Sequence, residues 1–344
     1  MSTVTAPKAT LLLTREQPDR VARLDRSKEL RRVRPGVYVR TEEWAALAPW
    51  DRYELRVEAV QRTWTDPIFC FESAARSHGL PVFDEPRFIH LFNPGGTSWR
   101  EGDVIVHGAK GGRSTTTVDG RTVTSADETA IDLCRVLPPA FALAVADTAL
   151  RMLRASDKKL GFGALGRQQA DRRGRRQLDW LDDFADARAE SVGESVSRAV
   201  IRWLGYADPD LQVEFEYEGC LDRADFYWRG VRTIGESDGY GKYDADNAAK
   251  MKQHFVNEKK REDRLRRYEK GFIRWDWPDT MRHAALDKKL KLGGIPRVRP
   301  RNVAMLATLA QSPRSFTREQ LRQRDKAESD RRNRRRHAER GDSR

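Results

Sequence analysis

The sequence predicts an α/β protein with more than one domain. Its 344 residues exceed what a single hydrophobic core usually organises. Stretches with apolar residues at helical spacing, such as 192–205, alternate with short runs of β-branched and aromatic residues, such as 211–217. A polar, heavily charged stretch separates two such regions. The expected parts are 1–56, 57–155, a charged linker over 156–187, 188–295 and a tail over 296–344.

Composition narrows the class of protein and its partners. Charged residues make up 34% of the chain, and no stretch has the length and apolar character of a membrane span. The first residues lack the long apolar run of a signal peptide. Cys70, Cys134 and Cys220 lie far apart in apolar segments, which predicts buried thiols in a cytoplasmic protein. The net charge of +13 favours a polyanionic partner, most simply DNA.

The N-terminal part contains a short helical region and then a predicted β-hairpin over 29–40. Apolar residues alternate with arginine and tyrosine in ELRRVRPGVYVR, and Pro35-Gly36 supplies the turn. Its arginines either contact DNA phosphates, as in the wing of a winged helix, or keep a solvated hairpin soluble. The local pattern favours neither alternative. The arginines concerned are Arg31, Arg32, Arg34 and Arg40.

The middle part is predicted to be mixed α/β. Residues 51–80 predict a helix, a short strand and a second helix, and residues 86–124 predict short strands separated by turns. Residues 125–154 predict two helices broken at Pro138-Pro139. His78, His90 and His107 fall on different elements without the spacing of metal ligands, so we expect them to be structural or surface residues.

The following domain opens with a helix whose apolar stripe recurs at helical spacing in SVGESVSRAVIRWLGY. Glu194 lies off this stripe, on a face with Arg198 and Ile201. It is either a surface glutamate or an acid directed into a site. Residues 211–217 predict the first strand of the domain.

A predicted β-hairpin over 220–243 carries two acidic side chains on one face. With Arg229-Gly230 as the turn, Asp225 pairs with Ile234, and strand alternation places Glu236 and Asp238 on that same face. Asp225 and Glu236 then become diagonal neighbours, roughly 5–8 Å apart. A four-residue loop preserves this parity. Two carboxylates at such a separation suit one Mg²⁺ or Mn²⁺ ion together with waters and phosphate oxygens.

The acidic pair has a structural alternative. Two carboxylates in an otherwise apolar run need either a metal or a basic partner, and Lys242 or the cluster 259–261 could supply the second without any chemistry. A long helix over 246–270 precedes a strand containing Arg274. Arg261 and Arg274 could contact a scissile phosphate or form ion pairs with nearby acids, and ion pairing is favoured for Arg261.

The C-terminal part, 296–344, changes character. IPRVRPRNV is rich in proline and arginine, and RNRRRHAER is strongly basic. We expect a mostly disordered tail with one short helix near 315–328 and with non-specific attraction to phosphates.

The acidic hairpin resembles the very-short-patch-repair-like endonuclease domains of the PD-(D/E)XK nuclease fold. Their hallmark, an Asp on one strand and Glu-x-Asp-Gly on the next, is matched by Asp225 and Glu236-Ser237-Asp238-Gly239 over about residues 188–280. The resemblance implies an α/β/α domain in which Asp225 and Glu236 bind Mg²⁺. It also implies Glu194 as a further acid of the site and Gln212 as its neighbour.

One departure from the family pattern concerns its lysine. Asp238 stands where the lysine of the pattern is expected, and Lys242 is the nearest candidate for a migrated one. By resemblance, Lys242 would orient the attacking water, and Asp238 would bind a second metal or hydrogen-bond the turn.

Residues 10–155 resemble a second family, the AbiEi-type antitoxins. LRRVRPGVYV is similar to the wing of their N-terminal winged helix, and FESAARSHGLP and TSADETAIDLCRVLP are similar to their middle region. The segment between Leu13 and Leu30 is short and contains Pro18, which leaves little room for two full helices before the wing.

Two functions follow as hypotheses. The first is a DNA-binding protein with a metal-dependent endonuclease domain, in defence or mobile-element biology. The second is a non-enzymatic antitoxin and autorepressor, in which the nuclease fold is a scaffold and the partners are operator DNA, a toxin and a second copy of the chain. The enzyme needs a divalent ion at Asp225 and Glu236, whereas the repressor needs the wing arginines and a dimer.

Overall fold

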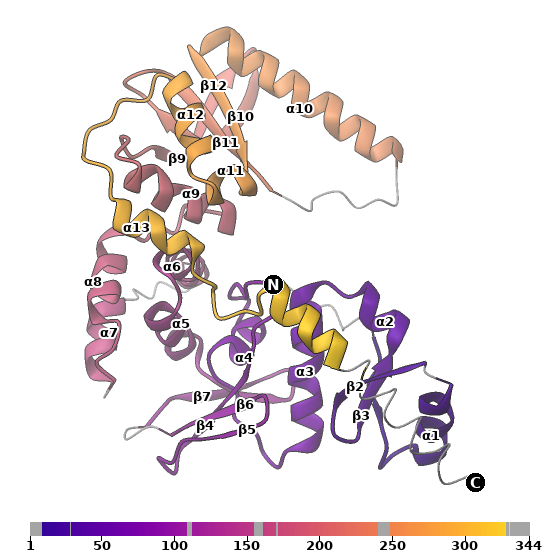
Figure 1. Cartoon of the computed structure of the whole chain (residues 1–344). Helices are drawn as coiled ribbons and strands as arrows, with labels where there is room; N and C mark the ends of the chain where they lie inside the picture. The colour runs from indigo at the N-terminus through magenta and orange to yellow at the C-terminus, as the bar shows by residue number, and fades with distance from the viewer. Residues whose placement is uncertain are drawn as a thin grey trace. The chain divides into compact units, whose positions relative to one another are not determined.

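The computed structural model of the chain describes residues 9–27, 29–108, 112–154, 161–169, 171–239, 248–327 and 330. The chain divides into two compact units. Unit 1 consists of Met1–Ser77, Val82–Thr124 and Ser312–Arg344, and unit 2 of His78–Pro81 and Ser125–Gln311. The α/β class expected from the sequence is confirmed, since both units combine helices with small sheets (Figure 1).

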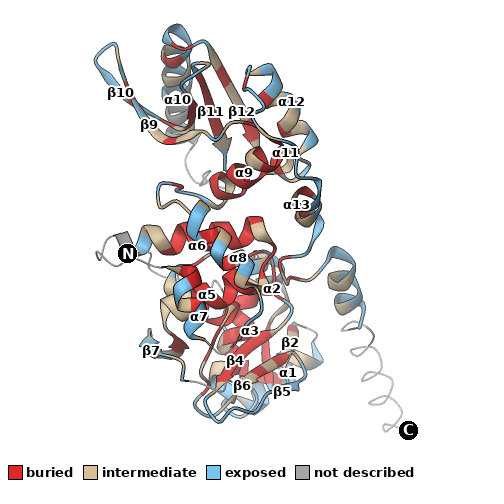
Figure 2. Ribbon diagram, turned by 90° about the vertical axis from the view of Figure 1, so that its left-hand side faces the viewer, coloured by how far each residue is buried: buried red, intermediate tan, exposed pale blue. Residues whose placement is uncertain are grey.

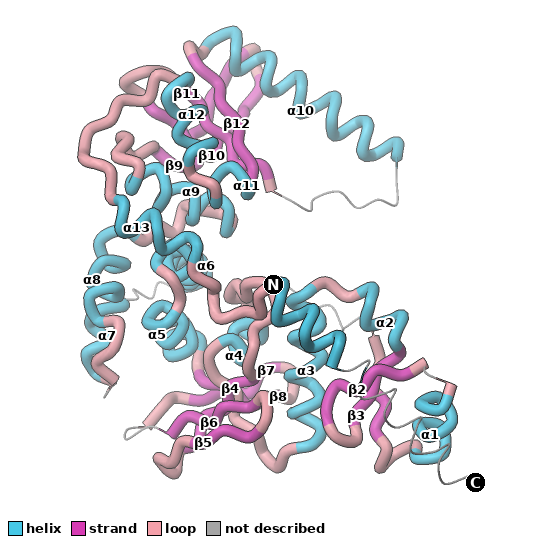
Figure 3. The backbone as a smooth tube through the Cα atoms, in the orientation of Figure 1, coloured by secondary structure: helices cyan, strands magenta, loops and turns pink. Residues whose placement is uncertain are grey.

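The first part of unit 1 is a three-stranded antiparallel sheet with three helices. The sheet order is β1-β3-β2, and the β2–β3 hairpin turns at Gly36, whose φ of +73° suits a glycine (Figure 3). One helix, beginning at Pro18, separates β1 from β2, in agreement with the short segment there. The elements are β1 (Leu12–Leu13), α1 (Pro18–Arg26), β2 (Leu30–Arg34), β3 (Val37–Arg40), α2 (Thr41–Ala46) and α3 (Pro49–Thr63).

The second part of unit 1 contains the short strands expected over 86–124. Strand β6 pairs parallel with β4 and antiparallel with β5, and β7 pairs with β8. Phe69 links both groups through single bridges to Leu91 and Val123. The elements are α4 (Glu72–Ala75), η1 (Arg76–His78), β4 (Ile89–Asn93), β5 (Trp99–Glu101), β6 (Val104–Gly108), β7 (Thr115–Val118) and β8 (Arg121–Thr124).

Helix α3 belongs to both hydrophobic cores of unit 1. Tyr53 and Val57 pack into the core formed with β4, β6 and β8, whereas Leu55 and Ala59 pack with the β2–β3 hairpin and α2. A helix with apolar residues around most of its circumference is expected where two layers cover it. This helix therefore holds the hairpin and the second sheet together.

Residues 296–311 belong to unit 2 and the chain returns to unit 1 at Ser312, so the predicted disordered tail is wrong for residues 296–327. Ser315 is buried and bridges to Pro86, and the Phe316 N–H donates to the Glu85 carbonyl at 2.9 Å. Residues 318–327 are helical, which confirms the short helix expected near 315–328. Arg324 reaches the buried Glu85 carboxylate at 3.1 Å. This pairing of residues 239 positions apart offsets the segment's lack of apolar residues.

Unit 2 begins with helices. Two of them are the helices expected on either side of Pro138-Pro139, which confirms that prediction. Cys134 is buried, as is Cys70 in unit 1, but Cys220 is exposed, contrary to expectation. The elements are α5 (Ala126–Val136), α6 (Pro139–Arg154), α7 (Phe162–Gln168), α8 (Arg175–Phe184), α9 (Val192–Trp203), β9 (Asp210–Tyr217), β10 (Cys220–Trp228), β11 (Thr233–Asp238), α10 (Ala248–Tyr268), β12 (Gly271–Asp276), α11 (Trp277–Met281), α12 (Ala284–Leu292), α13 (Val303–Ala307) and η2 (Thr308–Ala310).

The predicted linker over 156–187 is instead part of the helical layer of unit 2. Leu178 and Leu181 of α8 are fully buried among charged neighbours. Gln177 donates to the Leu137 carbonyl at 2.9 Å and so joins α8 to the end of α5. The boundary predicted at 155 therefore moves to 125, because the buried leucines of α8 need α5 and α6 to cover them. Figure 2 shows α5, α6 and α9 as largely buried.

The second half of unit 2 is built on one four-stranded mixed sheet in the order β12-β11-β10-β9. The β9–β10–β11 strands are antiparallel, and β12 joins β11 in parallel after the helix α10. Trp275 of β12 donates its indole N–H to Ser197 of α9 at 2.9 Å, whereas Phe272 packs with Leu265 of α10. Helices α9 and α10 therefore cover opposite faces of the sheet (Figure 1).

The acidic hairpin has a longer turn than predicted. Trp228 pairs with Thr233 and Phe226 with Gly235, so residues 229–232 form a four-residue loop and the predicted Asp225–Ile234 pairing is wrong. Arg232 adopts a left-handed φ of +52° within the loop. Because the pairing shifts by two residues, the two acids stay on the same face of the hairpin, as predicted. Along this register, the pair that follows is Asp225 with Glu236.

Gly235 lies where two tryptophans meet the sheet. A Cβ atom at this position would be 2.7 Å from Trp275 Cη2 and 2.9 Å from Trp228 Cζ3. We predict that Gly235→Ala lowers the free energy of unfolding of unit 2 by about 1–3 kcal/mol through overpacking. Hydrogen exchange of the β11 amides in urea measures this loss. Gly230→Ala in the open turn is the control, and an equal loss in both variants would contradict the packing argument.

Arg324 is predicted to stabilise unit 1 through its contact with Glu85. Arg324→Ala leaves a carboxylate that is 1% exposed, and Arg56, at 3.5 Å, is then its one remaining cationic partner among the described residues. We expect a loss of about 2 kcal/mol in unfolding free energy. Chemical denaturation followed by hydrogen exchange at β4 measures it. Arg322→Ala, on an exposed part of the same helix, should cost less than about 0.5 kcal/mol, and the same cost in both would show that the segment is only loosely attached.

Candidate active site

Asp225, which is half-buried, and Glu236, which is buried, form an acidic pair on the two central strands of the unit 2 sheet. They face α10, on the side where Ile234 and Tyr227 form a core with Leu265. Glu236 is 7% exposed. The Ser237 N–H donates to Asp225 Oδ2 at 2.9 Å, which fixes one carboxylate oxygen. The structure thus brings together the two acids that the sequence predicts as a pair.

Gln212 and Glu194 extend the acidic pair into a row. Asp225 lies between Ala224 and Phe226, which pair with Val213 and Leu211 of β9, so Gln212 is opposite Asp225. Gln212 donates its amide to Glu194 Oε2 at 2.9 Å. Glu194 is buried in the first turn of α9, so the surface-glutamate alternative is wrong. Its role as a neighbour of the acidic pair, which the family resemblance implies, agrees with its position.

Backbone strain accompanies this arrangement at Gln212. Its φ is +54°, a left-handed conformation that costs a residue with a side chain of the order of 1 kcal/mol or more. The conformation occurs inside β9, where the amide reaches Glu194. Strain of this kind persists only where surrounding contacts hold it, and it concentrates at functional sites.

Proximity and burial raise the pKa values of both central acids. Burial, followed by the charge of Glu194, raises the pKa of Asp225 to about 6. Burial, followed by the charge of Asp225, raises the pKa of Glu236 to about 7, against an opposing effect of the Arg261 guanidinium. Like charges in a poorly solvated place disfavour simultaneous ionisation. Near neutral pH, the site therefore lacks enough positive charge to balance its carboxylates.

Arg261 supplies part of that charge and confirms the predicted ion pairing. Its guanidinium donates to Glu236 Oε1 at 3.1 Å, to Glu258 at 2.7 Å and to the Arg223 carbonyl at 2.9 Å. Because Glu258 shares the same guanidinium, Arg261 does not neutralise the acidic pair by itself.

Arg274 and Asp238 lie beside the acidic pair but bind each other. Arg274 donates to Asp238 at 2.5 Å and to Glu262 at 3.0 Å. The question left open by the sequence is therefore answered in favour of ion pairing for Arg274. Asp238 is exposed and has a cationic partner, so a second metal site there finds no support in the contacts.

Asp225 and Glu236 are suitable ligands for one hard cation. Mg²⁺ commonly takes one or two protein carboxylates and completes its octahedron with waters and phosphate oxygens. The two raised pKa values show that a positive charge between the carboxylates would relieve an existing repulsion. Among the residues that the structure describes, no His, Cys, Asp or Glu side chains gather in threes as a closed metal site would require. An open two-carboxylate site fits. Lys242 lies outside the described residues.

The wing arginines are largely engaged in ion pairs within unit 1. Arg31 contacts Asp325 at 2.7 Å, Arg34 contacts Asp103, and Arg40 contacts Glu29 at 3.2 Å. The side chains of Arg31 and Arg34 are 16% and 9% exposed. These two side chains are therefore poorly placed to reach DNA phosphates, so the wing interpretation does not hold for them. They are not solvated either, so the solvated-hairpin alternative does not hold for them.

His90 and His107, which the sequence places on different elements, are in contact. His90 Nδ1 lies 2.8 Å from His107 Nε2, and Arg314 donates to His90 Nε2 at 2.9 Å. Burial, followed by the charges of Arg314 and His107, lowers the pKa of His90 well below its ordinary value. Since β4 and β6 are parallel neighbours, alternation in RFIHLF and DVIVHG could have placed the two rings on one face. The structural role expected for His90 agrees with these contacts.

Comparison with known proteins identifies two relatives and no family. The uncharacterized proteins MT2308 and Rv2248, from the CDC 1551 / Oshkosh and ATCC 25618 / H37Rv strains of Mycobacterium tuberculosis, are each 32% identical to the chain over 170 residues. The match covers 49% of this chain and 61% of each relative, so the chain spans less than two thirds of their length. No model of a protein family and no solved structure matches the chain.

No helix in the described ranges is both long enough and apolar enough to cross a membrane. This finding agrees with the absence of an apolar span in the composition.

The raised pKa of Glu236 predicts how stability depends on pH without metal. A folded-state pKa of about 7, against the ordinary 4.5, contributes stability that is complete below pH 4.5 and lost as the pH rises through 7. Glu236→Gln should therefore make unit 2 roughly 2 kcal/mol more stable than wild type at pH 8 in EDTA, with little difference at pH 4.5. Thermal unfolding at both pH values measures this.

Glu258 provides the control of opposite sign. Hydrogen bonds from Arg261 lower the pKa of Glu258, so its contribution to stability is present above its ordinary pKa and lost in acid. Glu258→Gln should lower the stability of unit 2 at pH 8. Destabilisation by both variants at pH 8 would contradict a repelling acidic pair.

Proposed function

We propose that unit 2 is a metal-dependent nuclease domain that hydrolyses phosphodiester bonds in DNA. The observation that carries the proposal is the acidic pair of half-buried Asp225 and buried Glu236, in which each carboxylate accepts a hydrogen bond and both pKa values are raised to near neutrality. Pairs of this kind are costly to a fold unless they bind a ligand of opposite charge. A phosphodiester substrate with a divalent ion supplies that charge.

The sheet and its helices support the finer assignment of the fold. Helix α9 covers one face of the β9–β12 sheet and α10 the other, which gives the α/β/α layers that the resemblance to PD-(D/E)XK nucleases implies. Glu194 at the start of α9 and Gln212 in β9 are hydrogen-bonded to each other beside the acidic pair, which supports the proposal. For the winged helix of unit 1, the support is the β2–β3 hairpin with helices α1, α2 and α3.

Each residue of the site has its own proposed role. Asp225 and Glu236 would hold Mg²⁺ or Mn²⁺, which when bound supplies polarisation of the phosphoryl oxygen and a water of lowered pKa. The Ser237 N–H orients Asp225, and Arg261 holds Glu236 in position. Glu194 fixes the Gln212 amide opposite Asp225. Lys242 is the proposed cation that orients the attacking water.

DNA is the proposed substrate because the chain has a net charge of +13 and the chemistry requires a phosphodiester. A role in defence or mobile-element biology is part of this proposal. If the acidic pair binds no metal, the antitoxin hypothesis takes its place. In that hypothesis the chain has a partner toxin and binds operator DNA as a homodimer.

The nuclease proposal predicts loss of cleavage when the acidic pair is altered. We expect the full chain to nick supercoiled plasmid in Mg²⁺ or Mn²⁺, and Glu236→Gln and Asp225→Asn to reduce the rate about a hundredfold or more. Asp238→Asn is the matched control, since its carboxylate binds Arg274 on the protein surface, and it should retain activity within about fivefold. Gel separation of nicked from supercoiled plasmid measures the rates.

Calorimetric titration of Mn²⁺ into the same variants separates failure of binding from failure of chemistry. Binding that is present in wild type and in Asp238→Asn but lost in Glu236→Gln supports the site. Equal binding in all the variants, or nicking that persists in Glu236→Gln, contradicts it and leaves the repressor hypothesis.

A further inference from the structure

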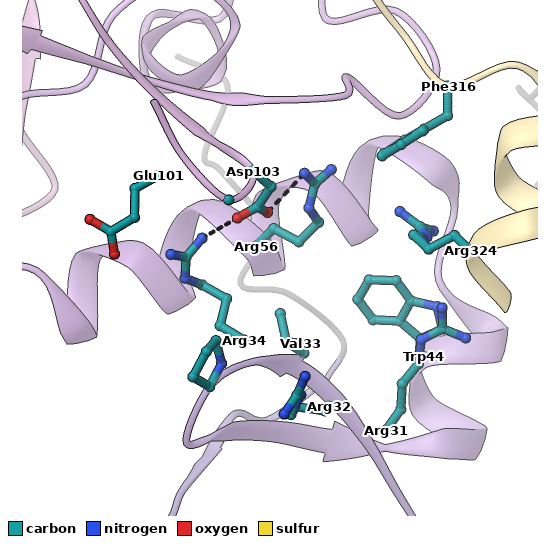
Figure 4. A pocket seen from close by; sticks show the side chains of 12 residues that line it. Arg31, Arg32, Val33, Arg34, Trp44, Arg56, Glu101, Asp103, Phe316 and Arg324 are labelled. Carbon is teal, nitrogen blue, oxygen red and sulfur yellow. Dashed lines mark hydrogen bonds and ion pairs between the residues drawn. The ribbon is translucent and has the colours of Figure 1, made fainter. Parts of the chain in front are cut away.

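Unit 1 contains a cavity of about 450 Å³ with an unusual concentration of arginine. It lies between strand β2, helices α2 and α3, the β5–β6 turn and the returning C-terminal segment (Figure 4). The arginines that line it come from three separate parts of the chain: Arg31, Arg32 and Arg34 from β2, Arg56 from α3 and Arg324 from the C-terminal helix. None of them belongs to the proposed nuclease site.

A β-bulge directs two of these side chains to the same side. The register between β2 and β3 shifts between Arg32 and Arg34, so that Arg31 pairs with Val39 and Arg34 with Val37. Val37 and Val39 are two residues apart and both face the core shared with α3. Regular alternation would have directed Arg31 and Arg34 to opposite faces, and the bulge re-aims one of them.

The carboxylates near the cavity are shared and do not match the arginines in number. Asp103 contacts both Arg34 and Arg56, the second at 3.1 Å, and Glu85 contacts both Arg56 and Arg324. The β5–β6 turn, with Gly102 at φ +58°, presents Asp103 between its two partners. Asp325 contacts Arg31 alone, at 2.7 Å. Figure 4 shows a further acid near the cavity, Glu101, which is exposed, apart from Arg31, Arg32 and Arg324.

Arg32 is the guanidinium without a carboxylate. Within the described part of the chain it forms no ion pair, and it is half-buried. It pairs with Tyr38 on the face of the sheet opposite to Arg31 and Arg34, and it lines the cavity from the edge strand β2. A half-buried guanidinium binds an anion strongly because its planar N–H groups match the oxygens of a phosphate. The cavity therefore combines one arginine without a carboxylate partner with three that share Asp103 and Glu85 and with Arg31, which pairs with Asp325.

The cavity also offers flat surfaces. The Arg324 guanidinium lies 4.7 Å from the centre of the Phe316 ring, and that of Arg31 lies 4.8 Å from the Trp44 ring. Planar guanidinium groups backed by aromatic rings are surfaces on which nucleobases stack. A phosphate ion alone would leave most of a cavity of 450 Å³ unfilled.

We propose that this cavity binds a nucleoside phosphate, with the phosphate on Arg32 and the base against the guanidinium planes. The same chemistry is offered by a free mononucleotide and by the phosphorylated end of a DNA strand. The inference goes beyond the proposed nuclease function, since it involves unit 1 and needs no metal.

The test is calorimetric titration of the full chain in EDTA with deoxyadenosine 5′-monophosphate, deoxyadenosine, inorganic phosphate and a short single strand with or without a 5′-phosphate. We expect the monophosphate or the 5′-phosphorylated strand to bind at least about tenfold more tightly than its unphosphorylated counterpart. Arg32→Gln should weaken that binding about tenfold or more. Arg23→Gln, an exposed arginine on α1 outside the cavity, should leave it within about twofold.

Each outcome decides the proposal. Selective loss in Arg32→Gln supports it, and the ligand that binds more tightly shows whether the source is a free nucleotide or a strand end. Equal weakening in Arg32→Gln and Arg23→Gln shows general attraction to a basic protein and overturns the proposal. No binding by any phosphorylated ligand, or inorganic phosphate binding as tightly as the monophosphate, also overturns it. Because EDTA removes divalent ions, failure here is independent of the nuclease site.

Discussion

The repulsion between Asp225 and Glu236 is the constraint around which unit 2 is arranged. Burial raises the pKa of both carboxylates, the charge of Glu194 raises that of Asp225 further, and the charge of Asp225 raises that of Glu236 further, so the pair opposes folding near neutral pH. The surrounding contacts compensate only in part. Ser237 binds one oxygen of Asp225, and Arg261 divides its charge between Glu236 and Glu258. An acidic pair maintained against this cost supports the proposal of a cation site.

The arrangement of charged groups in unit 1 differs from that in unit 2. There the arginines are in excess, and each shared carboxylate holds two of them around a cavity whose walls come from distant parts of the chain. Helix α3 makes this possible because it carries Arg56 while it packs against both sheets of the unit. The returning C-terminal segment completes the wall with Arg324. Unit 2 thus gathers acids around a shared arginine, whereas unit 1 gathers arginines around shared acids.

Local patterns predicted the acidic pair, and physical reasons explain what they missed. Strand alternation placed Asp225 and Glu236 on one face, and a four-residue turn preserves this parity although it changes the pairing. Val231 is β-branched and suits a strand, so propensity could not distinguish the two turns. The Arg324–Glu85 contact joins residues 239 positions apart, and no local pattern reveals it. Likewise, the buried leucines of α8 were hidden among charges, and a linker was predicted in place of a packed helix.

The most direct test of the acidic pair is a ¹³C NMR titration of the carboxyl carbons of Asp225 and Glu236, with and without Mg²⁺. Without metal, the account predicts titration midpoints near 6 and 7, and with Mg²⁺ both should move to lower pH because the ion favours the charged forms. Midpoints near the ordinary values of the two groups, unchanged by Mg²⁺, would show that the carboxylates neither repel each other nor share a cation. That result would contradict the account at its centre.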